Sequence, residues 1–130
     1  MAKHPSVELL QRAYEAFAKG DLATLREVAS EEGVWHVPGS GPLAGEYRGW
    51  DEVVTLFTRS AQMTGGTERI EVHDILANDE HGVALTRYTA SREGKQLDMR
   101  IVNVFHVKDG KITEVWDFME DLRVYDEFWS

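Results

Sequence analysis

The sequence contains no cysteine, and this absence excludes disulfide bonds, a thiol nucleophile and a thiolate metal site. A chain without disulfides suits a reducing compartment, so we expect a cytoplasmic protein. Basic residues are also few: 14 lysines and arginines stand against 23 aspartates and glutamates, for a formal net charge of −9 at pH 7. Such a charge repels phosphate backbones and anionic lipid surfaces, so neither nucleic acid nor a membrane is predicted as a partner.

Long apolar runs are missing as well. Runs such as IVNVF at 101–105 fall far short of the roughly 20 residues that a membrane-spanning helix needs. The first ten residues, MAKHPSVELL, lack the apolar region of a signal peptide. A chain of 130 residues is long enough to form one hydrophobic core without disulfide bonds or a structural metal, so we predict a single soluble domain over residues 1–130.

Three helices are predicted in the first half of the chain. Apolar residues at helical spacing, together with glycine and aspartate at the boundaries, place them at 5–19, 21–31 and 49–64. A short strand at 34–37 ends at Pro38, and a loop rich in glycine and proline follows it. We expect that loop at a rim of the molecule.

Four strands are predicted in the second half. They alternate apolar and polar residues, and short connectors separate them, so neighbours in sequence should pair antiparallel. Their ranges are 67–77, 82–93, 96–108 and 111–119. Three N-terminal helices packed in a curved, mainly antiparallel sheet form an α+β domain. Residues 120–130 carry aromatics at helical spacing, and this tail either covers the mouth of a pocket or docks on the outside of the sheet or on a partner subunit.

The last two strands form a hairpin that carries two isolated polar residues. Asp109-Gly110 predicts a tight type I′ turn. Asn103 lies on a mainly apolar face six residues before this turn, and Asp117 lies among aromatic residues seven after it. Alternation therefore brings both side chains to one face, nearly opposite each other. Because buried polar groups need a partner or a purpose, we predict that they share a pocket.

A structural role remains open for both residues. Asp117 can form an ion pair with Arg87 or Arg100, and Asn103 can satisfy a backbone group at a bulge.

Three motifs carry a resemblance to a known family. They are AYEAF followed by KGDL, VWHVPG followed by GPLAGEYRG, and FHVKDGKITEVWDF. Over residues 6–120 the chain resembles the SnoaL-like branch of the NTF2-like superfamily, which is related to polyketide cyclases and ketosteroid isomerases. The resemblance implies a cone in which a curved sheet wraps a long helix and encloses an apolar pocket open at one end. It also implies a homodimer across the sheets and chemistry without a cofactor.

The resemblance carries over to single positions. Asp117 falls where SnoaL-type cyclases place their acid/base aspartate. Asn103 falls where those cyclases have a histidine and where the isomerases have a protonated carboxylic acid that donates to the substrate oxygen. His36 falls at or next to the isomerases' general base. The isomerases' tyrosine on the first helix corresponds to Ala13, and we expect Tyr14 to point elsewhere.

Two functions follow from these residues. The first is a cofactor-free isomerase or cyclase acting on a small apolar carbonyl compound, in which Asp117 or His36 takes a proton and Asn103 holds the enolate oxygen. The second is a non-catalytic domain that binds or carries an apolar ligand in the same pocket. Whether the chain is an enzyme stays open at this stage. The residues expected to line the pocket are Tyr14, Phe17, Trp35, Trp50, Phe57, Met99 and Phe105.

Two further expectations concern metals and assembly. No metal site is predicted, because the histidines lack partners at ligand spacing. The outer face of the sheet is expected to carry apolar residues that mark a homodimer interface. These residues are Val102, Val104, Ile112, Trp116 and Phe118.

Overall fold

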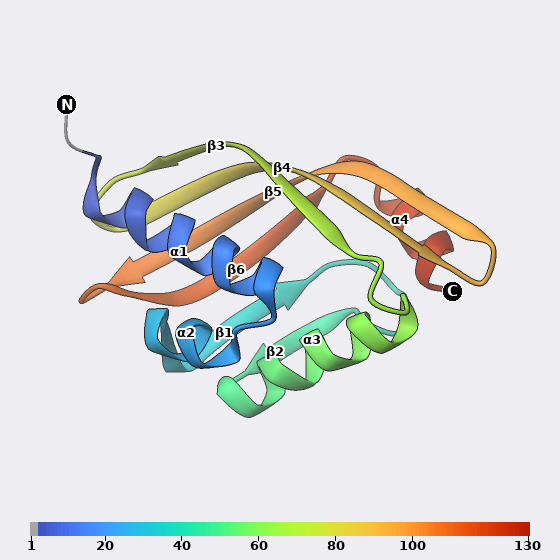
Figure 1. Ribbon diagram of the computed structural model, residues 1–130, viewed down its shortest axis with the longest axis horizontal. Coiled ribbons are helices and arrows are strands. Elements are labelled where there is room, and N and C mark those ends of the chain that lie inside the picture. Colours follow the sequence, from blue (N-terminus) through green and yellow to red (C-terminus); the bar gives the residue numbers. More distant parts are fainter. Residues whose placement is uncertain (1–2) are drawn as a thin grey trace.

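The computed structural model describes residues 3–130, which form one six-stranded sheet and four helices (Figure 1). The helices are α1 (Pro5–Lys19), α2 (Leu22–Val28), α3 (Trp50–Met63) and α4 (Leu122–Trp129). The strands are β1 (Ala29–Val37), β2 (Gly45–Arg48), β3 (Arg69–Ala77), β4 (His81–Arg92), β5 (Lys95–Lys108) and β6 (Lys111–Met119). No helix within residues 3–130 is long and apolar enough to cross a membrane.

Local sequence explains where the first helices begin and end. His4 caps α1 by accepting the backbone N–H of Ser6, and the helix ends at Gly20, whose φ of 67° favours glycine. Asp21 caps α2 by accepting the N–H of Thr24 at 3.1 Å. The second helix ends earlier than predicted, because the chain turns extended at Ala29 to pair with β6.

The sheet has the order β2-β1-β6-β5-β4-β3 and is mixed. Strands β3 to β6 form an antiparallel meander, whereas β1 pairs parallel with β6 and antiparallel with β2. The α+β class is therefore confirmed. Strand β2 was not predicted, because glycine and proline dominate the loop assigned to residues 38–45 just before it. It forms because Tyr47 and its neighbours pair with β1 at Trp35.

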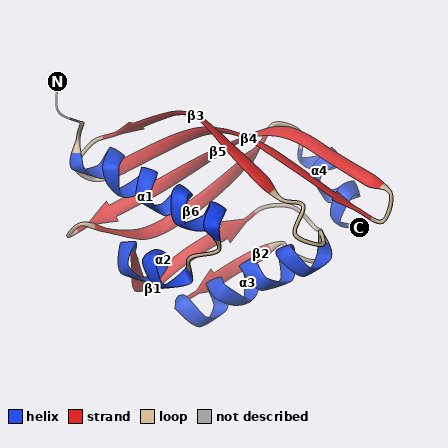
Figure 2. Ribbon diagram, in the orientation of Figure 1, coloured by secondary structure: helices blue, strands red, loops and turns tan. Residues whose placement is uncertain are grey.

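The helices α1, α2 and α3 lie on one side of the curved sheet, and α4 lies at the end where β4 turns into β5 (Figure 2). Arg92 holds α4 there by donating to the backbone carbonyl of Phe128 at 2.9 Å. The core divides into two clusters of buried residues. One contains Leu10, Val28, Ala84 and Phe105 between α1, α2 and the sheet; the other contains Leu56, Tyr88, Met99 and Trp129 between α3, α4 and the sheet.

A bulge corrects one face assignment in the hairpin. The register of β5 with β6 shifts between His106 and Val107, so Val107 faces Ile112 and Thr113 is left as the extra residue. Ile112 is therefore only 7% exposed and packs in the inner core, whereas the alternation had placed it on the outer face. Beyond the bulge the alternation holds, and Phe118 on the outer face is 55% exposed.

Candidate functional site

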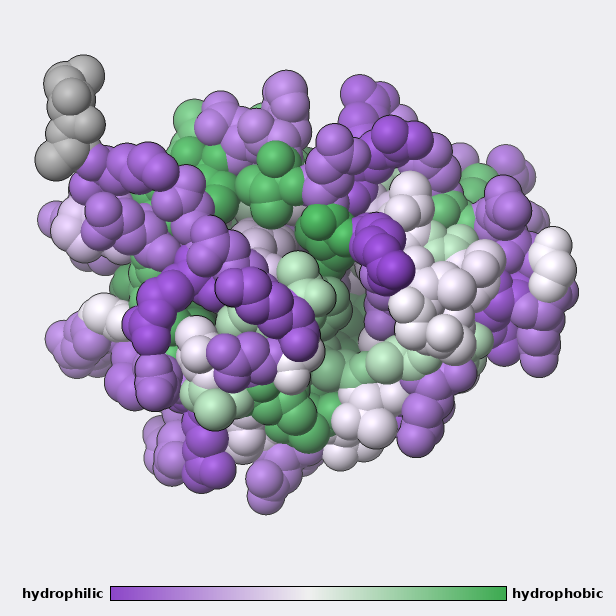
Figure 3. Space-filling view, viewed as in Figure 1, coloured by the Kyte–Doolittle hydropathy of each residue, from purple (hydrophilic) through white to green (hydrophobic). Residues whose placement is uncertain are grey.

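A cavity opens between the helices and the inner face of the sheet. It encloses about 1240 Å³, counted with the open space at its mouth. Figure 3 shows a hollow in this face of the molecule, with apolar residues inside and hydrophilic residues around it. Most of its wall is aliphatic or aromatic, which is typical of a site for a small apolar molecule.

Asp117 and Asn103 lie together in the wall of this cavity. The two residues are direct partners across β5 and β6, and the Asn103 Nδ2 donates to Asp117 Oδ1 at 2.6 Å. The indole Nε1 of Trp35, from β1, donates to the second oxygen of Asp117 at 3.0 Å. The side chains predicted to share one pocket therefore do so, and the carboxylate carries two hydrogen bonds. Neither Arg87 nor Arg100 pairs with Asp117, because they bind Asp98 and Glu120 instead.

Tyr14 completes this polar group from α1. Its hydroxyl donates to Asn103 Oδ1 at 2.5 Å, which corrects the expectation that Tyr14 points elsewhere. The amide of Asn103 is thereby fixed, because its oxygen faces the Tyr14 hydroxyl and its nitrogen faces the Asp117 carboxylate, which when ionised can only accept. The same amide keeps a second N–H that neither partner uses.

Burial shifts the pKa values of two of these groups. Desolvation raises the pKa of Asp117 from 3.8 to about 6, and the hydrogen bonds from Trp35 and Asn103 hold it back from a higher value. A carboxylate with this pKa is mostly ionised at pH 7 and still basic enough to accept a proton. Burial, with a smaller contribution from the Asp117 charge, raises the pKa of Tyr14 far above its usual value, so Tyr14 remains a donor.

Aromatic rings form the apolar part of the wall beside Asp117. Phe57 meets Phe17 and Trp35 edge to face, with ring centroids 5.3 and 5.1 Å apart. Trp50 and Phe105 also line the cavity, as the sequence predicted. Met99 does not. It is 4% exposed and packs in the core cluster that also holds Leu97 and Trp129, so its assignment to the cavity wall was wrong.

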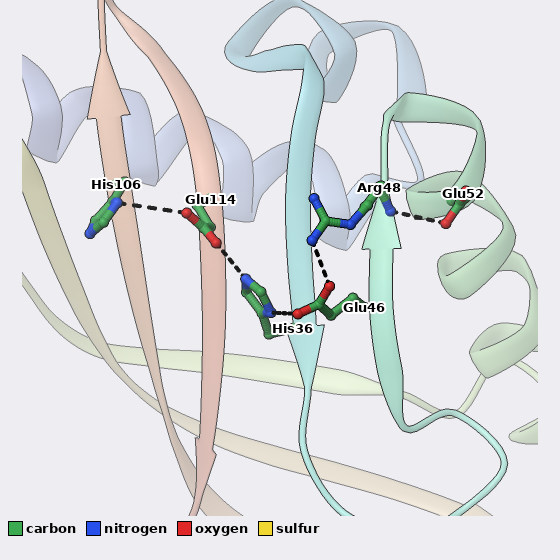
Figure 4. A network of polar contacts seen from close by, with 6 residues as sticks. All are labelled: His36, Glu46, Arg48, Glu52, His106 and Glu114. Carbon is green, nitrogen blue, oxygen red and sulfur yellow. Dashed lines mark hydrogen bonds and ion pairs between the residues drawn. The ribbon is translucent and has the colours of Figure 1, made fainter.

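His36 lies outside the cavity, on the other face of the sheet from Trp35. Its Nε2 contacts Glu114 Oε2 at 2.5 Å and its Nδ1 lies 3.4 Å from Glu46 Oε1. Figure 4 shows these contacts as part of a network that runs from His106 to Glu52. The ring also stacks on Trp116 at 5.0 Å. The structure therefore corrects the placement of His36 beside Asp117, and His36 cannot serve as the base of this cavity.

Sequence reasoning missed two features of the site. Trp35 was expected only as an apolar wall residue, and its N–H bond to Asp117 depends on the parallel pairing of β1 with β6, which local patterns do not reveal. A second polar group of Glu68, Ser60 and Tyr88 also lines the cavity. No motif marks these three residues, because they come from three separate elements. Within residues 3–130 no group of three or more histidines, aspartates or glutamates is arranged to hold a metal ion.

Comparison with known proteins identifies the family of the chain. Residues 10–115 match the SnoaL-like domain family. An uncharacterised protein of Mycobacterium tuberculosis, Rv0034, is 36% identical over the whole length of both chains. The structure of Bal32a, from a soil-derived mobile gene cassette, is 35% identical and superimposes with a TM-score of 0.93 over 97% of each chain.

A more distant structure shares the fold alone. IdmH of Streptomyces antibioticus, a candidate polyketide cyclase, is 23% identical with a TM-score of 0.74, over 91% of this chain and 93% of its own. The family match covers most of the chain, and two relatives exceed 30% identity over nearly their whole length. The chain is therefore a member of the SnoaL-like domain family.

Proposed function

We propose that this protein is a cofactor-independent enzyme that removes a proton next to the carbonyl group of a small, largely apolar compound, as an isomerase or cyclase does. The observation that carries the proposal is Asp117, a carboxylate with a pKa of about 6 on the wall of an apolar cavity. A general base works best when its pKa lies near the working pH, and here burial provides that shift. The fold of IdmH, a candidate polyketide cyclase, is consistent with such chemistry.

The proposed proton removal accounts for the proton and the electron pair with groups that line the cavity. The substrate C–H bond breaks, its proton goes to the carboxylate of Asp117, and the electron pair forms an enolate whose negative charge rests on the carbonyl oxygen. The unused N–H of Asn103 donates to that oxygen, and Tyr14 holds the amide in the required orientation. Return of the proton to another carbon gives an isomer, and attack of the enolate on a second carbonyl gives a ring. A preorganised donor of this kind contributes roughly 3 kcal/mol of transition-state stabilisation in comparable sites.

Deuterium exchange tests the proposal without knowledge of the natural substrate. The protein is incubated in D₂O with tetralone, a bicyclic aryl ketone of mainly apolar surface, and the loss of the proton next to the carbonyl is followed by NMR. We expect the wild type to accelerate exchange and Asp117→Asn to abolish the acceleration. We expect Asn103→Ala to slow it by roughly a hundredfold, through loss of the donor. Asp98→Asn, which removes an exposed carboxylate on the outer face, is the matched control and should leave the rate unchanged.

The affinity of each variant for tetralone distinguishes an enzyme from a domain that only binds its ligand. Trp35 and Trp50 line the cavity, so quenching of tryptophan fluorescence reports tetralone binding in each variant. Asp117→Asn should bind within about tenfold of the wild type, because only a group used in proton transfer has changed. Saturable binding to the wild type without any acceleration of exchange would refute the enzyme proposal. That result would favour the binding or carrier domain.

We also infer that the chain forms a homodimer of two-fold symmetry across the outer face of the sheet. This face carries exposed Leu76 and Phe118 and half-buried Val102, Val104 and Trp116. Apolar side chains gathered on one face of a sheet are typical of an interface. A monomer mass by light scattering at micromolar concentration would refute this inference.

A further inference from the structure

The cavity holds a second polar group that the proposed proton transfer does not use. Glu68, which precedes β3, accepts a hydrogen bond from the hydroxyl of Ser60 at 3.0 Å and another from the hydroxyl of Tyr88. Ser60 lies on α3 and Tyr88 on β4, and each is 7% exposed. All three residues line the cavity, so three separate elements bring polar side chains to one place.

The carboxylate of Glu68 has acceptor capacity to spare. Its two oxygens can accept about four hydrogen bonds, and Ser60 and Tyr88 provide two. Within residues 3–130 it forms no ion pair with a lysine, arginine or histidine. Burial and the neighbouring carboxylate raise the pKa of Tyr88 well above its usual value, so Tyr88 stays a donor to Glu68 and cannot neutralise it. A half-buried carboxylate without a cation is costly, and a donor on a ligand would offset that cost.

The charge of the wall indicates what kind of ligand fits. Asp117 and Glu68 are among its lining residues, and no lysine, arginine or histidine of the described chain is among them. An anionic ligand is therefore disfavoured, whereas a hydrogen-bond donor is favoured. This end of the cavity thus holds an acceptor with spare capacity, the carboxylate of Glu68, which matches the hydroxyl donor of a ligand.

The two polar groups lie apart along the sheet. Asn103 pairs with Ala84 on β4, and Tyr88 lies four residues further along that strand. At about 3.3 Å per residue the two backbone positions are roughly 13 Å apart. Between them the wall carries apolar Ile101 and its strand partner Thr86, whose hydroxyl already donates to the backbone carbonyl of Ile101 at 2.7 Å. A ligand that reaches both groups therefore has two polar ends joined by an apolar body.

Resting on the proposed function, we propose that Glu68, Ser60 and Tyr88 form a binding site for a hydroxyl group of the substrate, at the end of the cavity away from Asp117. The substrate class is accordingly a neutral hydroxy ketone with an apolar ring system between its carbonyl and its hydroxyl. Anionic carboxylate or phosphate compounds do not belong to it.

Four tetralones test this site by binding alone. They carry a hydroxyl, methoxy, aminomethyl or carboxylate group on the aromatic ring, and their affinities are measured by tryptophan fluorescence on the full chain. The hydroxy and methoxy ketones differ in one donor. We expect the hydroxy ketone to bind the wild type at least tenfold more tightly than the methoxy ketone, because a hydrogen bond to a charged group is worth about a factor of ten or more. In Glu68→Gln this preference should fall to less than threefold.

Control variants make the test of the hydroxyl-binding site independent of the test of catalysis. Asp117→Asn should retain the preference for the hydroxy ketone, so the site can be established even if no exchange is catalysed. Thermal melting shows whether Glu68→Gln is folded. The wild type provides a test that does not depend on this variant: equal affinity for the hydroxy and methoxy ketones would by itself overturn the proposal. An unchanged preference in folded Glu68→Gln would overturn it as well. So would tightest binding of the carboxylate, or of the cationic aminomethyl ketone.

Discussion

Ionisation of Asp117 should destabilise the folded protein, and pH can reveal this cost. The pKa of Asp117 is about 6 in the folded chain, whereas the ordinary value, expected in the unfolded chain, is 3.8. The unfolded state therefore loses this proton at lower pH than the folded state does. Stability from the protonated form is present below about pH 4 and is lost as pH rises through about 6. A shift of about two pKa units corresponds to roughly 3 kcal/mol of unfolding free energy.

The variant Asp117→Asn isolates this contribution. Trp35 and Asn103 donate to different oxygens of Asp117, and an amide at residue 117 replaces one of these oxygens with an NH₂ group, so one buried donor is left unpaired. That loss costs about 1 to 3 kcal/mol at every pH. The pH-dependent part of the unfolding free energy is separate, because only the wild type has a buried carboxyl at residue 117 whose ionisation destabilises the folded state. The stability of the wild type relative to Asp117→Asn should therefore fall by roughly 3 kcal/mol between acidic and neutral pH.

Urea unfolding of both proteins from pH 4 to pH 7.5 measures the difference. All other titrating groups are common to the two chains and cancel when one curve is subtracted from the other. Asp109→Asn, in the exposed turn between β5 and β6, is the control for removal of one carboxylate and should run parallel to the wild type. Parallel curves for Asp117→Asn and the wild type would refute the raised pKa and the argument built on burial.

Three further predictions concern other parts of the structure. Trp35→Phe removes a hydrogen bond that lowers the pKa of Asp117, so the carboxyl should titrate above pH 6 by infrared spectroscopy; an unchanged midpoint would contradict this. Gly82→Ala would place its Cβ 2.4 Å from Leu10 Cδ1 in the core, so urea unfolding should show a loss of about 1 to 3 kcal/mol, and an unchanged midpoint would show that Leu10 moves freely. Phe118→Asp should convert the proposed dimer to a monomer by light scattering, and a mass unaffected by the charge would exclude the outer face as the interface.

Local sequence signals predicted the parts of the fold that depend on neighbours in the chain. The first helix has the predicted range because capping at His4 and the glycine at position 20 define both ends. Counting residues from Asp109-Gly110 predicted that Asn103 and Asp117 lie on one face, and the observed pairing confirms it. Both results follow from periodicity and turn chemistry, which act over a few residues.

Features that depend on distant segments could not be predicted in the same way. Met99 shares a face with Asn103, but α4 covers its end of the sheet, and the position of α4 is fixed by packing rather than by any local pattern. Glu68 joins the cavity because α3 and β4 bring Ser60 and Tyr88 to it.

The misplacement of His36, in contrast, was avoidable. Trp35 and His36 are neighbours on one strand, so alternation forbids both from entering the same cavity.

The pH dependence of deuterium exchange into tetralone is the most direct test of the claim that Asp117 is the base. If exchange requires the ionised carboxylate, the rate catalysed by the wild type rises with pH and reaches half its plateau near pH 6, the pKa of Asp117. Asp117→Asn should show no such rise. A rate that is already at its plateau at pH 4.5, or a rise near pH 6 that persists in Asp117→Asn, would contradict the account.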